Sequence, residues 1–245
     1  MKIVFPTIHV RRSHQAIALA AGCLSAALPS ELGVNSVLLD IFPDQSDQEV
    51  LTSILEHNPD VVSFSVYLWN RQRVIAIANQ LRQQRSEIQL IAGGPEVTGN
   101  LDGLAESAPW TALIQGEGEA PLAALLRQLA QGAEPQPIPG VTRFCPERPQ
   151  SAPLQPRPEL DELPSPWLTG VLQPQPGGGV LWEVARGCAF SCDYCFDARG
   201  YSGVRTLERE RLEAELELFV ENGVSQVWVL DATFNFPPKR GIELL

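Results

Sequence analysis

Three cysteines lie within one short stretch of this 245-residue chain, at Cys188, Cys192 and Cys195. Their spacing is Cys-x3-Cys-x2-Cys, and they directly follow the apolar run 180–185, which has the pattern of a buried strand. Thiolates are soft ligands that bind zinc or the irons of a cluster. The stretch therefore predicts a loop that holds a metal centre at the carboxyl end of a strand.

Two kinds of metal centre compete for this loop. A structural zinc site uses four protein ligands, usually in two pairs. No second pair of Cys or His follows the cysteines, because the histidines of the chain are His9, His14 and His57, all far upstream. Three cysteines on a four-iron cluster instead leave one iron open to a substrate or cofactor. The spacing favours the iron–sulfur cluster, with zinc and a chance grouping as the alternatives.

Composition and charge narrow the class of protein. The chain is 44% hydrophobic, which is enough to bury a core, and its net charge of −11 argues against unspecific binding to nucleic acid or to an acidic membrane. No apolar run approaches the roughly 20 residues of a membrane span, and the N-terminus does not resemble a signal peptide. An odd number of cysteines, five, is not typical of a disulfide framework. We therefore expect a cytoplasmic metalloprotein with no membrane partner, and nucleic acid is disfavoured.

The elements that must position the cysteine loop begin with an α/β pattern over residues 1–132. Short apolar runs alternate with amphipathic helical patterns, which is typical of a parallel sheet covered by helices on both faces. Strands are predicted at 2–8, 36–40, 61–67, 88–92 and 112–114. Helix starts are predicted at Ser13, at a capping box from Ser46 to Glu49, at Asn70, near Leu101 and near Leu122. This domain is expected to be a five-stranded, Rossmann-like parallel sheet.

Ligands of such sheets bind outside the carboxyl ends of the strands. Here those ends carry histidines, aromatic residues and glycines, in the segments 9–14, 67–70, 93–95 and 116–119. Two glycine-rich ends and one aromatic end suit a large, flat ligand that the backbone approaches closely, although each glycine alone is explained equally well as a turn residue. No G-x-G-x-x-G follows the first strand, which argues against a nicotinamide dinucleotide.

Residues 133–179 differ from the rest of the chain because prolines are dense in them. Proline forbids long helices and central strands, so we predict a linker with one edge strand at 140–144 and with Cys145 as a bystander. The alternating pattern then resumes over 180–245. It predicts a strand at 180–185, a helix from about Thr206 to Asn222 that ends at Gly223, a strand at 226–230 and the start of a helix in 237–245. This βαβ pattern begins a second parallel-sheet domain.

Together these motifs resemble a known family. The three cysteines, with Tyr194 just before the third, look like the signature of radical S-adenosylmethionine enzymes, and residues 1–132 resemble the cobalamin (B12)-binding domain that one large branch of them carries. More narrowly, the runs 65–70, 93–96, 116–119, 186–188 and 231–235 are similar to those of a bacterial subgroup with a C-terminal domain of undefined function. The implied fold is α/β: a cobalamin-binding domain followed by the first βα units of an incomplete radical S-adenosylmethionine β/α barrel.

The resemblance implies roles for the residues around the cysteines. Cys188, Cys192 and Cys195 would hold a 4Fe-4S cluster whose open iron binds S-adenosylmethionine. The reduced cluster would cleave that cofactor to methionine and a 5′-deoxyadenosyl radical. Tyr194 would lie against the adenine, the alternative being an aromatic residue that packs on the barrel rim. Asp231 would contact the amino group or ribose of S-adenosylmethionine, with helix N-capping as its alternative.

For cobalamin, the resemblance implicates the strand ends of the first domain. Many cobalamin proteins supply a histidine to cobalt from Asp-x-His-x-x-Gly after the first strand, and this motif is absent here. We therefore predict that the dimethylbenzimidazole is displaced without a histidine replacing it, and His14 is the only rival. As a residue of the first helical turn, His14 is expected to be a surface residue more than a metal ligand. The candidate cobalamin residues are His14, Ser65, Tyr67, Trp69, Asn70, Gly93, Gly94, Pro95, Gly116, Glu117 and Gly118.

The implied activity is methyl transfer to an unactivated carbon of a small-molecule substrate, with electrons from a donor such as flavodoxin or ferredoxin. Radical rearrangement or cyclisation is the alternative reaction. Because a barrel of this kind needs about 200 residues and only 180–245 follow the linker, we expect a truncated chain. Such a chain would turn over weakly or not at all. A cobalamin-binding or cluster-carrying module without catalysis is therefore a second class of function, and a zinc module is a third.

Overall fold

The computed structural model describes residues 1–132, 136–144, 149–153, 159–195, 203–236 and 238–243. The chain forms two compact units. The first unit comprises Met1–Arg12 and Ala20–Arg157, and the second comprises Ser13–Leu19 and Pro158–Leu245. The proline-rich segment 133–179 is thus divided between the two units, and Cys145 lies outside the described residues.

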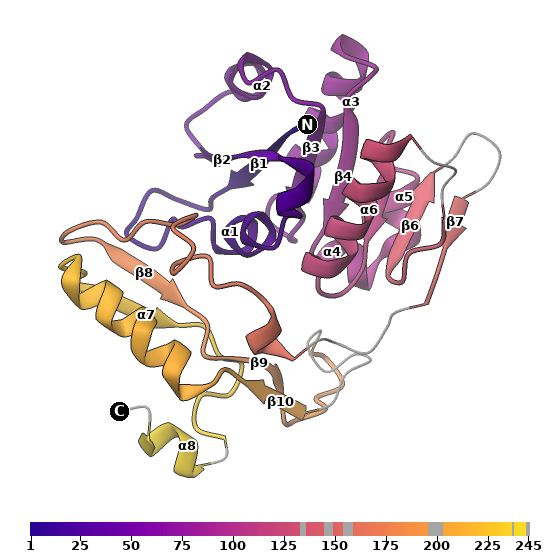
Figure 1. The fold of residues 1–245 in the computed structure, drawn as a ribbon. Coiled ribbons are helices and arrows are strands. Elements are labelled where there is room, and N and C mark those ends of the chain that lie inside the picture. The colour runs from indigo at the N-terminus through magenta and orange to yellow at the C-terminus, as the bar shows by residue number, and fades with distance from the viewer. Residues whose placement is uncertain (133–135, 145–148, 154–158, 196–202, 237, 244–245) are drawn as a thin grey trace. The chain divides into compact units, whose positions relative to one another are not determined.

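The first unit is built on a seven-stranded sheet in the order β2-β1-β3-β4-β5-β6-β7 (Figure 1). Its first five strands are all parallel, which confirms the predicted α/β fold. They are β1 (Lys2–Ile8), β2 (Asn35–Ile41), β3 (Val61–Ser65), β4 (Gln89–Gly93) and β5 (Ala112–Ile114). Two antiparallel strands, β6 (Val141–Phe144) and β7 (Pro149–Ser151), extend the sheet. The proline-rich segment therefore contributes the predicted strand near 140–144 and a further one.

The parallel strands other than β2 are mostly buried on both faces. Successive residues of a strand point to opposite faces of the sheet, and Ile3, Val4 and Phe5 are all at most 2% exposed. The helices of this unit are α1 (Leu19–Ala26), α2 (Asp47–Glu56), α3 (Arg71–Gln84), α4 (Pro95–Gly99), α5 (Leu101–Ala105) and α6 (Glu119–Gln131), with a 3-10 turn at Ser30–Leu32. The apolar faces of these helices supply buried residues such as Ile54, Ile77 and Leu81 to the core.

The start of the first helix was predicted wrongly. The helix begins at Leu19, because the Ser13 hydroxyl accepts a hydrogen bond from the N–H of Gln15 at 3.2 Å and so closes a local turn. His14 is exposed in this turn and is not in the first turn of a helix. By contrast, the capping box at α2 is confirmed: Ser46 Oγ accepts from the N–H of Glu49 at 3.3 Å, and Glu49 Oε2 accepts from the N–H of Ser46 at 2.6 Å.

The second unit contains the predicted parallel βαβ arrangement. Strands β8 (Gly179–Trp182) and β11 (Gln226–Val229) pair in parallel, and α7 (Arg209–Glu221) lies between them in the chain. The run 180–185, however, is not one strand. The chain leaves β8 after Trp182 and re-enters an antiparallel pair of β9 (Ala185–Cys188) and β10 (Gly203–Thr206). The unit also contains a 3-10 turn at Leu160–Glu162 and α8 (Pro238–Glu243).

Two long-range contacts explain these differences from the prediction. The N–H groups of Val184 and Ala185 bond to the side chain of Asp231, at 3.2 and 3.0 Å, so the β8 ladder cannot continue through them. Helix α7 begins at Arg209 because Thr206 ends β10 and the Asp161 carboxylate accepts the N–H of Glu208 at 3.1 Å. The end of α7 agrees with the prediction, since Gly223 has a φ of +65°.

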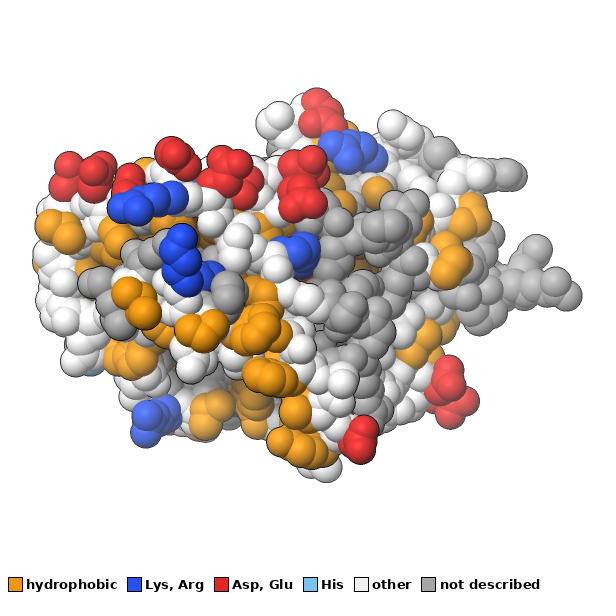
Figure 2. Space-filling view, turned by 90° about the horizontal axis from the view of Figure 1, so that it is seen from below, with side chains coloured by type: hydrophobic (Ala, Val, Ile, Leu, Met, Phe, Trp, Pro, Cys, Tyr) orange, Lys and Arg blue, Asp and Glu red, His pale blue; other side chains and the backbone are white. Residues whose placement is uncertain are grey.

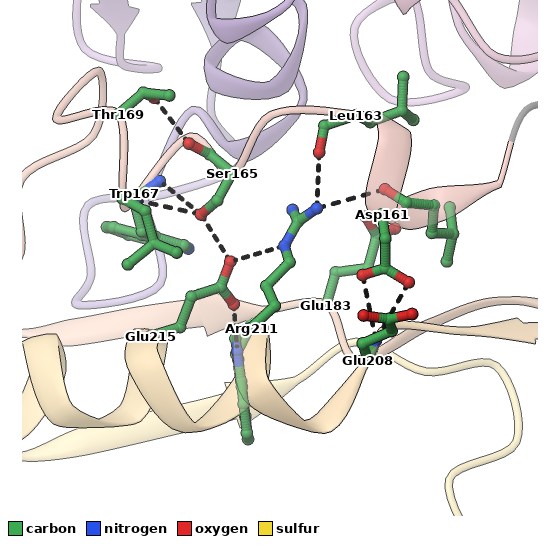
Figure 3. A network of polar contacts seen from close by, with 12 residues as sticks. Asp161, Leu163, Ser165, Trp167, Thr169, Glu183, Glu208, Arg211 and Glu215 are labelled. Atoms are coloured by element: carbon green, nitrogen blue, oxygen red, sulfur yellow. Dashed lines mark hydrogen bonds and ion pairs between the residues drawn. The ribbon is translucent and has the colours of Figure 1, made fainter.

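The core of the second unit holds a buried polar network (Figure 3). Glu215, on α7, is 2% exposed and accepts hydrogen bonds from the Ser165 hydroxyl at 2.5 Å and from the Trp182 indole at 2.7 Å. Arg211 pairs with Glu215 and donates to the carbonyl oxygens of Leu160 and Leu163. The network binds the segment 160–169 to α7 and β8, so the end of the proline-rich segment belongs to this core.

The second unit also exposes apolar side chains. In the described part of the chain β11 pairs only with β8, and Val227, Val229 and Leu230 are 37–49% exposed. Figure 2 shows a band of hydrophobic side chains on one face of the molecule. Parallel strands are normally covered on both faces, so β11 has the exposure expected of a strand that further elements would cover. Among the described residues, no helix is both long and apolar enough to cross a membrane.

Candidate functional site

The carboxyl end of β3 is shaped by Asn70. This side chain is 3% exposed; its Oδ1 accepts the N–H of Tyr67 at 2.8 Å, and its Nδ2 donates to the carbonyl oxygen of Ser65 at 3.0 Å. The prediction that Asn70 caps α3 through its side chain is wrong, because both of its polar atoms are used in the preceding loop. The strand also ends at Ser65, before the predicted Tyr67. Asn70 therefore fixes the loop that presents Tyr67 and Trp69.

Tyr67 and Trp69 form a stacked aromatic pair. Their ring centroids are 4.4 Å apart and their planes differ by 9°. Trp69 is 59% exposed and the neighbouring Leu68 is 80% exposed. Burial raises the pKa of the Tyr67 hydroxyl above its ordinary value, with a smaller contribution from Cys23 on α1. The pair presents a flat apolar surface beside the strand end, the kind of surface on which a planar ligand stacks.

The end of β4 requires glycine at position 94. Gly94 has a φ of +101°, and a Cβ there would lie 2.9 Å from the carbonyl oxygen of Val66. The two loops are hydrogen-bonded, since Val66 donates to Gly93 O at 2.8 Å and accepts from the N–H of Glu96 at 3.2 Å. Pro95 starts α4 directly afterwards. The predicted glycine pair therefore serves a close approach between the β3 and β4 loops.

Thr98 joins the β4 loop to the β5 loop, and the sequence analysis missed it. Its hydroxyl donates to Gly94 O at 3.1 Å and accepts the N–H of Gly116 at 2.9 Å. Gly116 has a φ of +75°. A Cβ at Gly118 would lie 2.9 Å from a methyl carbon of Leu24, so α1 also approaches this edge closely. The segments 65–70, 93–98 and 116–118 thus form one connected edge, which we call the glycine edge.

His9 lies directly after β1 and contacts residues at the end of β2. His9 Nε2 lies 2.6 Å from Asp40 Oδ1, and its ring stacks on Phe42 with centroids 5.2 Å apart. The Arg12 guanidinium lies 4.0 Å from the centroid of the same Phe42 ring. His9 is therefore engaged by its own neighbours. His14 belongs to the second unit, and its predicted relation to cobalamin stays a prediction.

The cysteine loop starts at the end of β9, and glycine is required just before its first cysteine. Gly187 has a φ of +94°, and a Cβ there would lie 2.3 Å from the carbonyl oxygen of Gly203 on β10. Cys188 Sγ lies 3.2 Å from the Thr233 hydroxyl. Cys192 is exposed, and its carbonyl oxygen accepts the N–H of Cys195 at 2.9 Å. The tight pairing of β9 with β10 thus explains why glycine precedes the first cysteine.

The three thiols differ in how they are placed. Across the described residues, no group of three His, Cys, Asp or Glu side chains is close enough to hold a metal ion. Cys188 and Cys195 are partly buried and Cys192 is exposed. Tyr194, next to Cys195, is 89% exposed. Three soft thiols on one loop suit an iron–sulfur cluster by their donor chemistry.

The side chain of Asp231 is buried, and protein groups occupy both of its carboxylate oxygens. Its Oδ1 accepts the N–H groups of Val184 and Ala185, and its Oδ2 pairs with Arg240 at 2.7 Å. The Asp231 side chain is 2% exposed. It does not cap a helix, since α8 begins only at Pro238. Asp231 therefore anchors the segment that leads into the cysteine loop, and its predicted contact with S-adenosylmethionine stays a prediction.

Comparison with known proteins identifies the class. Residues 8–126 match the B12 binding domain family. The chain is 32% identical over 213 residues to 2-(S-pantetheinyl)-carbapenam-3-carboxylate methyltransferase of Streptantibioticus cattleyicolor, covering 80% of this chain and 30% of that protein. It is also 32% identical over 216 residues to the cobalamin-dependent radical SAM methyltransferase TokK of Streptomyces tokunonensis, again with 80% and 30% coverage.

The fold agrees with a solved structure. The cobalamin-dependent S-adenosylmethionine radical enzyme OxsB, with aqua-cobalamin and S-adenosylmethionine bound, superposes with a TM-score of 0.77 at 18% identity over 95% of this chain and 34% of that one. The chain thus spans about a third of the length of these three proteins. Residues 8–126 are thus a B12 binding domain, and the chain is similar to cobalamin-dependent radical S-adenosylmethionine proteins, as the motifs indicated.

Proposed function

We propose that this protein binds cobalamin at the glycine edge and a 4Fe-4S cluster on Cys188, Cys192 and Cys195, as part of a radical S-adenosylmethionine methyltransferase. The observation that carries the proposal is the combination of a B12 binding domain match over 8–126 with three soft thiols on a loop of the second unit. Both named relatives are methyltransferases, which favours methyl transfer over rearrangement or cyclisation.

When bound, the cluster supplies the electron that cleaves S-adenosylmethionine to a 5′-deoxyadenosyl radical, and cobalamin carries the methyl group. The chain's own residues hold and orient these groups. The three thiols would be the protein ligands of the cluster, and Tyr194, which is exposed beside Cys195, is free to lie against the adenine. The proposed substrate is a small molecule and the proposed electron donor is flavodoxin or ferredoxin.

For cobalamin, the glycine edge offers close backbone approach and a flat surface. Gly94 and Gly116 have backbone conformations that favour glycine, and the Tyr67–Trp69 pair lies beside them in the same edge. His9 is paired with Asp40, so it is not offered as a ligand to cobalt. We therefore propose that the dimethylbenzimidazole is displaced without any histidine of the chain replacing it on cobalt, His14 being the only rival. An EPR spectrum of the cob(II)alamin form tests this: nitrogen superhyperfine splitting that is lost in His14→Ala would overturn it.

Anaerobic reconstitution tests the two binding functions separately. We expect the purified protein to take up iron, sulfide and corrin, and we expect Cys188→Ala/Cys192→Ala/Cys195→Ala to lose iron and sulfide but to keep corrin. This split is expected because the three cysteines and the glycine edge belong to different units. Zinc in place of iron by elemental analysis would contradict the cluster, and loss of corrin in the cysteine variant would contradict the separate cobalamin site.

A second candidate is a cofactor-binding module without turnover. The observation behind it is the exposure of three apolar residues in and after β11, Val227, Val229 and Leu230. Assay of 5′-deoxyadenosine with the reconstituted protein and a chemical reductant separates the candidates. Formation of 5′-deoxyadenosine supports the enzyme, and a loaded protein that forms none supports the module.

A further inference from the structure

The sulfur of Cys188 has a hydroxyl partner that comes from a distant part of the chain. Cys188 Sγ lies 3.2 Å from Thr233 Oγ1, within hydrogen-bond distance for sulfur. Cys188 is the last residue of β9, and Thr233 lies in the loop that follows β11. A thiolate carries no proton, so once the sulfur is a metal ligand the hydroxyl is the only possible donor of this bond.

The loop that carries Thr233 is fixed on both sides of it. Asp231 accepts the N–H groups of Val184 and Ala185. Arg240 donates to Asp231 Oδ2 at 2.7 Å and to the carbonyl oxygen of Phe234 at 3.2 Å. The side chains of Asp231 and Arg240 are only 2% and 12% exposed, and a pair of this kind is costly to break. Thr233 thus lies between Asp231 and Phe234, and Arg240 donates a hydrogen bond to each of these two residues.

We propose that Thr233 is a positioning residue that donates a hydrogen bond to the Cys188 sulfur and raises the reduction potential of the cluster. This inference rests on the proposed function, since it needs the cluster on Cys188. A hydrogen bond to a ligand sulfur withdraws negative charge from it. It therefore stabilises the reduced cluster, which carries one more electron, over the oxidised one.

The threonine side chain itself suggests the test. Serine keeps the hydroxyl and lacks only the methyl group, whereas valine keeps the shape and lacks the hydroxyl. Thr206, an exposed residue of β10, offers a control. Thr206→Val removes a hydroxyl from the two-stranded sheet that contains Cys188, at the end away from that cysteine. A role for Thr233 in folding alone would leave the potential of a fully loaded cluster unchanged.

The experiment is an EPR-monitored redox titration of the anaerobically reconstituted full chain, in the wild type and in Thr233→Val, Thr233→Ser and Thr206→Val. At a fixed potential near the wild-type midpoint, we expect Thr233→Val to lower the ratio of reduced to oxidised cluster about threefold, equivalent to about 28 mV for a one-electron couple. Thr233→Ser and Thr206→Val should titrate like the wild type. Thr233→Ala is measured beside Thr233→Val, so that a variant that fails to fold does not decide the result.

The outcomes separate this inference from the function on which it rests. A wild-type protein that takes up no 4Fe-4S cluster overturns both. A loaded wild type whose midpoint is unchanged in Thr233→Val and Thr233→Ala overturns the role of Thr233 and leaves the cluster standing. A downward shift that Thr233→Ser shares with Thr233→Val also overturns it, because the hydroxyl would then not be the cause.

Discussion

The glycine edge of the first unit and the cysteine loop of the second unit are both built at strand ends, and they are held in shape in different ways. In the glycine edge, neighbouring loops bond directly to one another through Asn70 and Thr98. In the cysteine loop, the entry is anchored by Asp231, while Cys192 and Tyr194 remain exposed. The described bonds that shape the first site thus run between its own loops, whereas those cited for the second lie at its entry.

The difference follows from the sheets beneath the two sites. A sheet with five parallel strands supports the glycine edge, whereas β8 and β11 form a sheet of two strands among the described residues. A metal on the three cysteines, as proposed, would add free energy that stabilises this smaller unit. We expect variants to separate the two sites, and the following predictions are ordered by the size of their effect.

The largest effect is expected for Asp231→Ala. The substitution leaves Arg240 buried without its partner and removes the acceptor for two N–H groups, so the free energy of unfolding should fall by about 3–5 kcal/mol. Urea unfolding followed by tryptophan fluorescence measures it, since Trp167 and Trp182 lie in the core of this unit. Glu217→Ala, an exposed change on α7, is the control and should be nearly neutral. If Asp231→Ala left the free energy of unfolding unchanged, the anchoring role would be contradicted. The predicted contact with S-adenosylmethionine would then be the remaining role for Asp231.

A large effect is also expected at Gly94 in the glycine edge. Gly94 has φ +101° and ψ −175°, a region that only glycine adopts readily, and an added Cβ meets the Val66 carbonyl oxygen at 2.9 Å. Gly94→Ala should therefore cost about 3 kcal/mol and weaken corrin binding. Gly132→Ala is the matched control, because Gly132 also has positive φ but has nothing within 4 Å of an added Cβ; it should cost about 1 kcal/mol. Equal losses in the two variants would show that the close approach is unimportant.

A smaller effect is expected for Trp69→Ala, and on binding only. Trp69 is 59% exposed, so its loss should leave the urea midpoint nearly unchanged, while the stacked surface offered to a corrin is removed. We expect the Kd for hydroxocobalamin to rise about tenfold, or about 1.4 kcal/mol. Leu68→Ala changes an even more exposed neighbour and serves as the control. A tenfold loss in both variants would point to the loop as a whole and away from the aromatic pair.

The smallest effect concerns the capping box of α2. The hydrogen bond from Ser46 lowers the pKa of the Glu49 carboxyl below its ordinary value of 4.5. A carboxyl with a lowered pKa in the folded state stabilises the fold above pH 4.5, and this stabilisation is lost as the pH falls through the lowered pKa. The difference in urea midpoint between the wild type and Glu49→Gln should therefore shrink below pH 4.5. A difference that is the same at neutral and acidic pH would contradict this origin.

The predictions from sequence succeeded where the signal is local. The five parallel strands follow from short apolar runs, and the capping box follows from residues three apart in the chain. They failed where another partner competed for a polar group, whether that partner lies nearby or far along the chain. Asn70 has the residue type and position of a helix cap, but the Ser65 carbonyl and the Tyr67 N–H compete for its side chain. The apolar run 180–185 favours one strand, yet Asp231 takes two of its N–H groups.

The sequence alone thus determined which chemistry is present: three thiols at a fixed spacing, glycines at strand ends and the α/β class, since these depend on residue type and short spacing. Only the tertiary structure decided how that chemistry is supported. Thr98 was not singled out, and Thr233 entered only as part of the run 231–235. A threonine hydroxyl acquires its role only from the atoms brought beside it, here Gly116 N and Cys188 Sγ. Hydrogen bonds act over about 3 Å in space with no regard to separation along the chain, and that is why the supports of both sites appear only in the folded protein.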